Sequence, residues 1–167
     1  MVLLGLSMLA SGLILAQIFK NSHIEALELN MAREIKLLET TFDFKKADGQ
    51  VDAATTAYYS TKANELEKLI DSRMTFIRTD GVVIGDSEMD VQHMDNHLDR
   101  EEIISAKKGK IGSAIRFSET IGEDMLYVAD YVNANGFEGY IRLSMSLSNV
   151  SEGLNKGWML MIAGLII

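Results

Sequence analysis

Charge is confined to the middle of this sequence, and this feature constrains the fold most. All 16 Lys and Arg residues and all 24 Asp and Glu residues lie between Lys20 and Lys156, so both ends are uncharged. Residues 1–19 come close to the roughly 20 apolar residues that a helix needs to cross a bilayer, whereas the uncharged residues at the other end are too few. We therefore expect a transmembrane helix at 1–19, an extracytoplasmic domain at 20–156 and the truncated start of a second transmembrane helix at 157–167.

A cleaved signal peptide is the alternative for the first segment. Its apolar run is long for a signal peptide, no basic residues precede it, and no convincing small-residue cleavage site stands before Lys20. These features favour a membrane anchor.

The composition excludes several classes of function. Cysteine is absent, so disulfides, thiolate metal sites and thiol catalysis are not available. The net charge of −8 argues against nucleic acid as a partner, because phosphate binding depends on clustered Lys and Arg. Eight acidic residues and one basic residue lie between Asp80 and Glu102. This acidic window favours a solvated surface, with divalent cations as the alternative partner.

Two amphipathic helices are predicted in the first half of the chain. Apolar residues recur every three or four positions from Ile24 to Phe42, which indicates a helix that continues out of the first segment. A weaker second stripe of Leu29, Leu37 and Phe44 would allow this helix to pair with a twin in a second subunit. A second helix is expected to run to about Asp71, with Asp52 as its N-cap.

A β-sheet is predicted for the second half. Residues 74–78 and 82–85 are β-branched and aromatic runs joined by Asp80-Gly81, the signature of a hairpin. A short helix is expected at 100–108, and strands follow at 111–118, 125–132 and 140–147. Residues 125–132 are nearly continuous in apolar character and are therefore expected to form a central strand of the sheet. Asn149 and Glu152 form a capping-box-like start to a final helix.

Several short motifs in this half resemble one protein family. They are Asp80-Gly81 with Asp86-Ser87, Asp95-Asn96-His97, Arg100-Glu101-Glu102, Arg116-Phe117-Ser118, Tyr127-Val128-Ala129 and Gly139-Tyr140-Ile141-Arg142. Together they resemble the extracytoplasmic sensor domain of PhoR-type sensor histidine kinases. The family commonly has Arg-Pro-Glu where this chain has Arg100-Glu101-Glu102. Losing that Pro should leave the fold intact.

The resemblance implies an α+β fold of the PAS-like (PDC/sCache-like) type, in which a long N-terminal helix packs along a five-stranded antiparallel sheet between two transmembrane helices. It also implies a homodimer through that helix and a parent protein with a cytoplasmic ATP-dependent kinase region that acts on a response regulator. ATP is the cofactor expected for that region, and none is expected for this chain.

A candidate ligand site is formed by strand arginines. Arg78, Arg116 and Arg142 fall in predicted strands, and with Tyr127 they are the candidate ligand-binding residues. On the concave side of the sheet their guanidinium groups could bind a carboxylate or phosphate, whereas on the outer side they would pair with surface acids.

Other chemistry has little support in the sequence. His93 and His97 would share a face of a helix, but a two-histidine metal site needs further ligands that the sequence does not place, so no metal site is assigned. No nucleophile elbow, phosphate-binding loop or His-Glu-x-x-His motif is present, so no catalytic residue is expected. The resemblance thus implies the membrane-bound sensing region of a histidine kinase in a two-component system of the phosphate-regulation kind. The alternatives are a chemoreceptor ectodomain and a membrane-anchored scaffold module.

Overall fold

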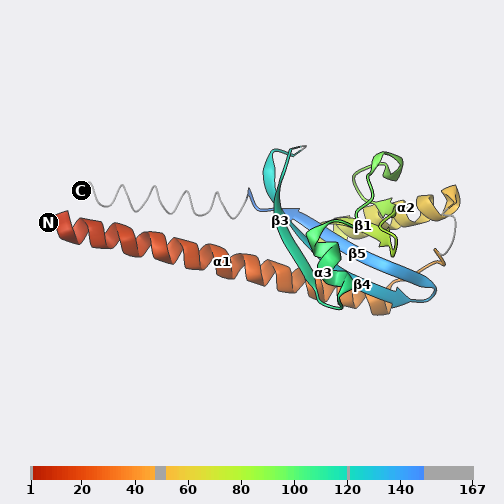
Figure 1. Ribbon diagram of the computed structural model, residues 1–167, viewed down its shortest axis with the longest axis horizontal. Coiled ribbons are helices and arrows are strands. Elements are labelled where there is room, and N and C mark those ends of the chain that lie inside the picture. Colours follow the sequence, from red (N-terminus) through yellow and green to blue (C-terminus); the bar gives the residue numbers. More distant parts are fainter. Residues whose placement is uncertain (1, 48–51, 120, 149–167) are drawn as a thin grey trace.

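The computed structural model describes residues 2–47, 52–119 and 121–148. Two helices come first, followed by a sheet whose strands are interrupted once by a short helix (Figure 1). The elements are α1 (Val2–Thr41), α2 (Ala53–Ile70), β1 (Arg73–Arg78), β2 (Val83–Asp86), the 3₁₀ turn η1 (Val91–His93), α3 (Glu101–Lys107), β3 (Gly112–Ser118), β4 (Glu123–Ala134) and β5 (Phe137–Ser146).

Helix α1 is continuous over 40 residues and packs on the sheet through its C-terminal half. Met31, Ile35 and Leu38 are buried, and Ile24 and Leu27 are partly buried against the same core, so the predicted stripe is confirmed. Of the second stripe, Leu29 and Leu37 are exposed, whereas Phe44 lies beyond the helix end and is buried.

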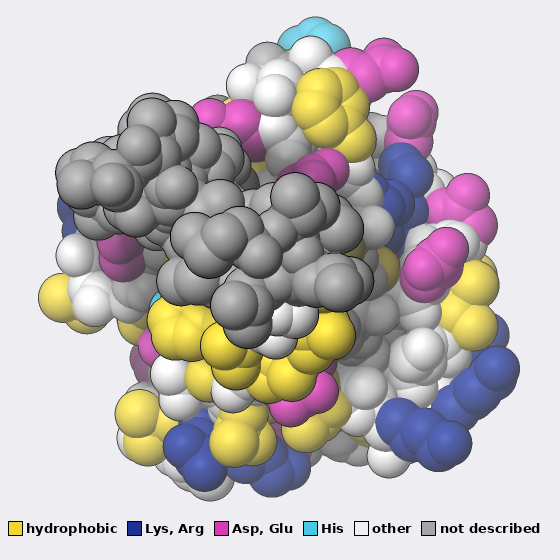
Figure 2. All heavy atoms as spheres, turned by 90° about the vertical axis from the view of Figure 1, so that its left-hand side faces the viewer, with side chains coloured by type: hydrophobic (Ala, Val, Ile, Leu, Met, Phe, Trp, Pro, Cys, Tyr) yellow, Lys and Arg dark blue, Asp and Glu magenta, His cyan; other side chains and the backbone are white. Residues whose placement is uncertain are grey.

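The N-terminal half of α1 projects beyond the sheet. Leu13, Ile14, Leu15, Ile18 and Phe19 are all more than half exposed. In the end-on view of Figure 2, hydrophobic side chains gather near the centre of the face and charged ones lie toward its margin.

No helix within the described residues combines the length and the apolar character needed to cross a membrane. The crossing expected at 1–19 therefore stays a prediction. The second crossing and the final helix from Asn149 lie outside the described residues.

Helix α2 begins and ends as its sequence predicts. The Asp52 side chain accepts a hydrogen bond from the Thr55 amide at 2.7 Å, which satisfies one of the free donors of the first turn. Asp71 ends the helix in the left-handed conformation, with φ of 52°. Tyr59 and Ala63 bury the inner face of α2.

The sheet is antiparallel, with strand order β2-β1-β5-β4-β3. Gly81, at φ of 86°, makes the predicted turn between β1 and β2. The middle strand is β5, not β4 as its apolar run suggested. The reason is that β4 is buried in part by helix α1 on one face and helix α3 on the other, and this burial also produces a continuous apolar sequence.

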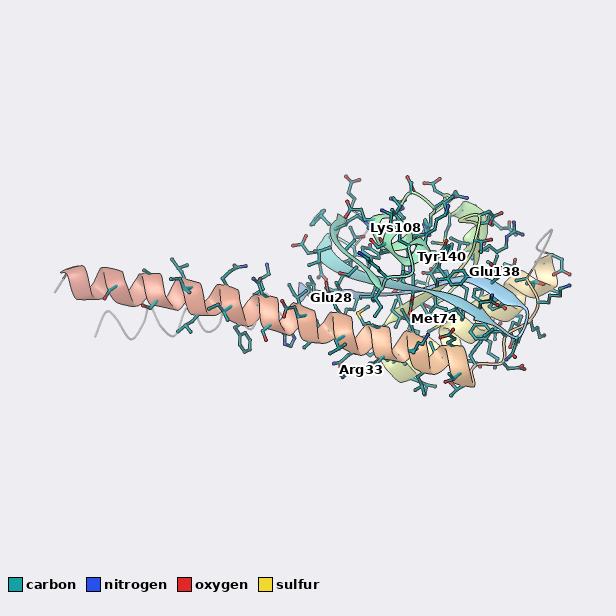
Figure 3. The ribbon with its side chains drawn as sticks, turned by 60° about the horizontal axis from the view of Figure 1, so that its bottom comes forward. Glu28, Arg33, Met74, Lys108, Glu138 and Tyr140 are labelled. Carbon is teal, nitrogen blue, oxygen red and sulfur yellow. The ribbon has the colours of Figure 1, made fainter. Side chains whose placement is uncertain are left out.

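The two faces of the sheet differ in their cover. Met74, Phe76, Ile141 and Leu143 point toward α1 and α2 and form the larger hydrophobic core. Ile77, Ala129 and Tyr140 point to the other face, where Ile103 and Ala106 of α3 cover them. Figure 3 shows Met74 on the α1 side and Tyr140 and Lys108 on the opposite side. Since α3 covers only part of the second face, that face carries the cleft described next.

Candidate functional site

A cleft of about 400 Å³ lies on the α3 face of the sheet. Its floor comes from β1, β3, β4 and β5, and the segment between β2 and α3 forms its wall. The lining residues are mostly polar and include four arginines and two histidines: Arg73, Met89, His93, Met94, Asp95, His97, Arg100, Arg116, Phe117, Ser118, Tyr127 and Arg142.

Arg116 is held in the cleft by a buried carboxylate. Its Nη1 and Nη2 atoms donate to Glu102 Oε2 and Oε1 at 2.6 and 2.9 Å, and its guanidinium lies 4.1 Å from the centre of the Tyr127 ring. Glu102 is fully buried. Burial alone would raise the pKa of Glu102, but the hydrogen bonds from Arg116 and the charge of Arg142 outweigh this effect and hold the pKa below its ordinary value. The carboxylate is therefore ionised at neutral pH.

The close approach of α3 and β3 is what brings this pair together. A Cβ atom at Gly112 of β3 would stand 1.8 Å from the Glu102 carbonyl oxygen, so only glycine permits the contact. Because Glu102 lies in the first turn of α3, this approach brings its side chain to Arg116 of β3.

Arg142 is the most deeply buried arginine of the cleft, with a side chain only 5% exposed. Its Nη2 donates to Thr75 Oγ1 at 3.1 Å, and its Nη1 lies 3.6 Å from Glu102 Oε1. Burial lowers the pKa of Arg142 to about 10, so the group is still charged at neutral pH. Its Nε has no hydrogen-bond partner among the described residues. A buried cationic donor without an acceptor is costly, so the floor of the cleft can gain an acceptor oxygen.

Arg73 forms ion pairs with two acidic residues at the edge of the cleft. Its Nε and Nη2 both contact Asp86 Oδ1 at 3.1 Å, and its Nη1 lies 3.2 Å from Glu88 Oε2. Asp86 also accepts from Thr75 Oγ1 at 2.8 Å, so Arg142, Thr75, Asp86 and Arg73 form one connected network.

His97 lies in the wall of the cleft as a neutral group. Burial, together with the charges of Arg142 and Arg100, lowers its pKa to about 4. Its Nδ1 is buried with no hydrogen-bond partner in the part of the chain that the structure describes. Its backbone amide donates to Gly81 O at 2.9 Å, and Asn96 Nδ2 donates to Asp80 O at 2.8 Å, so this segment is tied to the β1–β2 turn.

The Single Cache-like family model matches residues 21–146, which is most of the chain. The chain belongs to the Single Cache-like family. Cache domains are the extracytoplasmic sensor domains of membrane receptors, among them histidine kinases and chemoreceptors. No curated protein matches the sequence.

Solved structures share the fold of this Cache domain at low sequence identity. The ligand-binding domain of the Campylobacter jejuni chemoreceptor Tlp3, in complex with 4-methylisoleucine, is 10% identical with a TM-score of 0.61 and is matched over 86% of this chain and 60% of its own. The V. cholerae histidine kinase DctB sensor domain is 18% identical with a TM-score of 0.52, and the match covers 90% of this chain and 57% of the DctB chain. The ligand-binding domain of the Pseudomonas aeruginosa amino acid chemoreceptor PctC, in complex with GABA, is 15% identical with a TM-score of 0.56. The match covers 86% of this chain and 69% of the PctC chain. This Cache domain thus spans about three fifths of the length of the first two.

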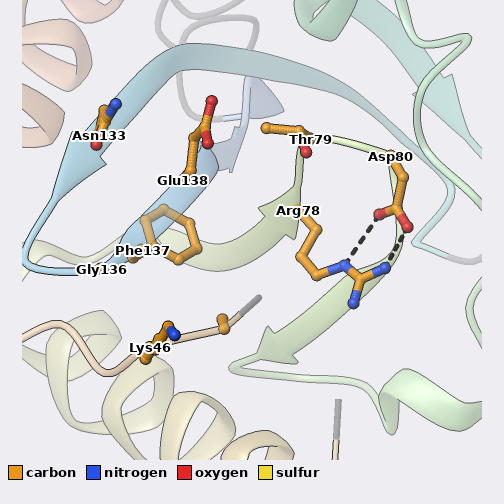
Figure 4. Close-up of a pocket in the computed structure, with 9 residues that line it drawn as sticks. Lys46, Arg78, Thr79, Asp80, Asn133, Gly136, Phe137 and Glu138 are labelled. Carbon is orange, nitrogen blue, oxygen red and sulfur yellow. Dashed lines mark hydrogen bonds and ion pairs between the residues drawn. The ribbon is translucent and has the colours of Figure 1, made fainter. Parts of the chain in front are cut away.

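The structure brings three of the four candidate residues together. Arg116, Tyr127 and Arg142 meet in the cleft, where Arg142 lies 5.3 Å from the Tyr127 ring centre. Arg78 lies elsewhere in the Cache domain, because strand side chains alternate. Arg73 and Thr75 of β1 point to the cleft, and Arg78 is an odd number of positions from each of them, so it points to the other face. It instead borders a separate pocket with Lys46, Phe137 and Glu138, where it pairs with Asp80 (Figure 4).

Among the residues that sequence reasoning missed are Arg73, which lines the cleft, and Glu102, which binds Arg116. Arg73 precedes Thr75 by two positions, so the same alternation could have placed it on the cleft face. Glu102 was counted in the acidic window as a surface residue, but it is fully buried, and Asp86 of the same window is also buried. The other six acids of the window, among them Asp90, Asp95 and Asp99, are exposed as expected.

The two histidines do not share a helix face. His93 lies in η1 with an exposed side chain, whereas His97 is buried in the loop that follows, so they share no helix. Among the described residues, no group of three or more His, Cys, Asp or Glu could hold a metal ion.

Proposed function

We propose that this chain is the extracytoplasmic sensing region of a membrane-bound, PhoR-type sensor histidine kinase, from a two-component system of the phosphate-regulation kind. The motifs between Asp80 and Arg142 support this choice of family, and the fold likeness to the DctB sensor domain is in keeping with it. The kinase region, with its ATP site and its response regulator, would belong to the cytoplasmic part of the parent protein.

The observation that carries the sensing role is the unpartnered Nε of Arg142 at the floor of the cleft. Arg116 and Arg73 already pair with Glu102, Asp86 and Glu88. An incoming ligand oxygen would therefore find its free donor on Arg142. We infer that the ligand carries a carboxylate or phosphate oxygen that Arg142 binds, while Tyr127 supplies an aromatic wall.

The position of Arg142 also suggests how binding reaches the membrane. Arg142 lies on β5, and β5 ends at Ser146, close to the C-terminal apolar segment. A ligand that binds one arrangement of a homodimer better than another would shift the population toward it, and α1 and β5 would carry this bias to the membrane segments. Leu29 and Leu37 on the exposed side of α1 provide the surface for the dimer.

The first test is autophosphorylation of the full-length parent protein in membranes, with ATP labelled on its terminal phosphate. A kinase gives an acid-labile, base-stable label, and inorganic phosphate or succinate should change its level if either probe occupies the cleft. Arg142→Met should abolish that change, whereas Lys107→Met, an exposed substitution on α3, should not. Thermal unfolding of each variant shows that it is folded. Absence of label from folded parent protein would refute the kinase assignment.

A chemoreceptor ectodomain is the second candidate, favoured by the fold likeness to the Tlp3 and PctC ligand-binding domains. A chemoreceptor would bind its ligand in the cleft but give no phosphohistidine label. A membrane-anchored scaffold module would give neither the label nor ligand binding.

A further inference from the structure

A second cavity of about 550 Å³ lies where α2 ends, β1 begins and β5 ends. We call it the β5-end cavity. It shares only Arg73 with the cleft described above. Its wall includes Ser144 and Ser146, so it borders the last residues of the strand that leads out of the domain.

Carboxylates dominate the charge of this cavity. Glu67 and Asp71 from the end of α2 and Glu88 from the loop after β2 line it, against Lys68 and Arg73. Arg73 is already shared between Asp86 and Glu88. Glu67 and Glu88 line this one cavity although they come from separate elements. The cavity therefore holds two acids side by side with a cation deficit around them.

The ionisation of Glu88 is opposed by its surroundings. Burial raises the pKa of Glu88, and the nearby charges of Glu67 and Asp86 add to this effect, while Arg73 works against it. A cation between the two carboxyl groups would stabilise both in the ionised form. Apolar side chains line the same cavity beside the acids, so a cation that carries an apolar body fits it.

A buried hydroxyl gives an independent indication of a ligand. Ser144 is 1% exposed and lines the cavity, and its Oγ has no hydrogen-bond partner among the described residues. Native proteins rarely leave such a group unsatisfied. Met125, Met145 and Ile121 also line the cavity and add apolar surface to it.

We propose that the β5-end cavity is a second binding site, which takes a primary ammonium group on a short apolar body. The ammonium lies between Glu67 and Glu88, and the body packs against Met125 and Met145. Binding bridges the end of α2 to the loop after β2, beside the end of β5. The proposal does not depend on which ligand the cleft binds or on which output domain the parent protein carries.

The test is a calorimetric titration of the complete 167-residue chain, held in neutral detergent, with n-butylamine. n-Butyrate, which has a similar size and the opposite charge, is the control probe. Glu67→Gln and Glu88→Gln should each weaken butylamine binding by about tenfold or more, because each removes a charge-assisted hydrogen bond. Glu65→Gln is the matched control, since Glu65 is exposed on the same helix and pairs with Lys62.

The expected result is binding of butylamine but not butyrate, with loss in the Glu67 and Glu88 variants and no change in the Glu65 variant. Binding should also weaken as the pH is lowered, because protonation of Glu88, whose pKa is raised, removes the charge that the ammonium binds. Absence of butylamine binding would overturn the proposal. So would equal weakening in all three variants, which would indicate only attraction to an acidic surface.

Discussion

His97 is a buried residue whose titration should appear in the stability of the whole domain. Its pKa is about 4 in the folded chain and 6.5 in the unfolded chain, so the unfolded state binds the proton first as the pH falls. The stability that this group contributes is complete above about pH 6.5 and is lost as the pH falls toward 4. A pKa shift of this size changes the free energy of unfolding by at most about 3 kcal/mol. Urea unfolding between pH 7 and 4.5 measures it.

His97→Gln should flatten this part of the profile, because glutamine does not titrate. His93→Gln is the control, since His93 is exposed in the wall of the same cleft. A profile as steep in the His97 variant as in the wild type would show that other groups cause the loss.

Single residues also show where sequence reasoning stops. Alternation along β5 correctly predicted that Arg142 lies on the other face of the strand from Ile141 and Leu143. It could not show that Glu102, forty positions away along the chain, would be its neighbour, because that contact depends on how closely α3 approaches β3. Arg78 was predicted as a member of the site, and strand parity excludes it.

At the scale of elements, α1 has two differently covered sides. Met31, Ile35 and Leu38 are buried against the sheet, whereas Leu29 and Leu37 are 50% and 62% exposed. If α1 pairs with its twin, Leu29→Glu combined with Leu37→Glu should raise the dimer dissociation constant by tenfold or more, since burial of each Leu is worth about 1.5–3 kcal/mol. Sedimentation velocity measures the change.

Leu69→Glu is the matched control, because Leu69 is 79% exposed on α2. It should leave the association of the chain unchanged. If the double variant on α1 associates as tightly as the wild type, the dimer uses another surface.

The elements themselves were largely predictable, because their signals are local. Asp52 caps α2, Gly81 turns the hairpin, and Gly109 ends α3 at φ of 71°. Strand order was not predictable in the same way. An apolar run indicates burial on both faces, and β4 gains that burial from α1 and α3 without being the middle strand.

At the scale of the whole molecule, regulation of the parent protein should depend on a stiff exit from β5. A six-residue Gly-Ser insertion after Ser148 should uncouple ligand from output, since a flexible linker absorbs a displacement. The autophosphorylation assay measures the level of label in the presence and in the absence of ligand. The same insertion between Asn135 and Gly136, in the β4–β5 turn, should leave regulation in place. Ligand-dependent labelling that survives the insertion after Ser148 would contradict this mechanism.

The pairing of β5 limits the kind of motion that this exit can transmit. Its partners are β1, from Arg73↔Ser144 to Arg78↔Gly139, and β4, from Met125↔Ser146 to Ala134↔Phe137. Sliding β5 by one residue would break both ladders and turn Arg142 into the α1 core. The strand therefore cannot act as a piston within the sheet. A movement that keeps both ladders intact must carry β5 together with β1 and β4, so the sheet would move as one body.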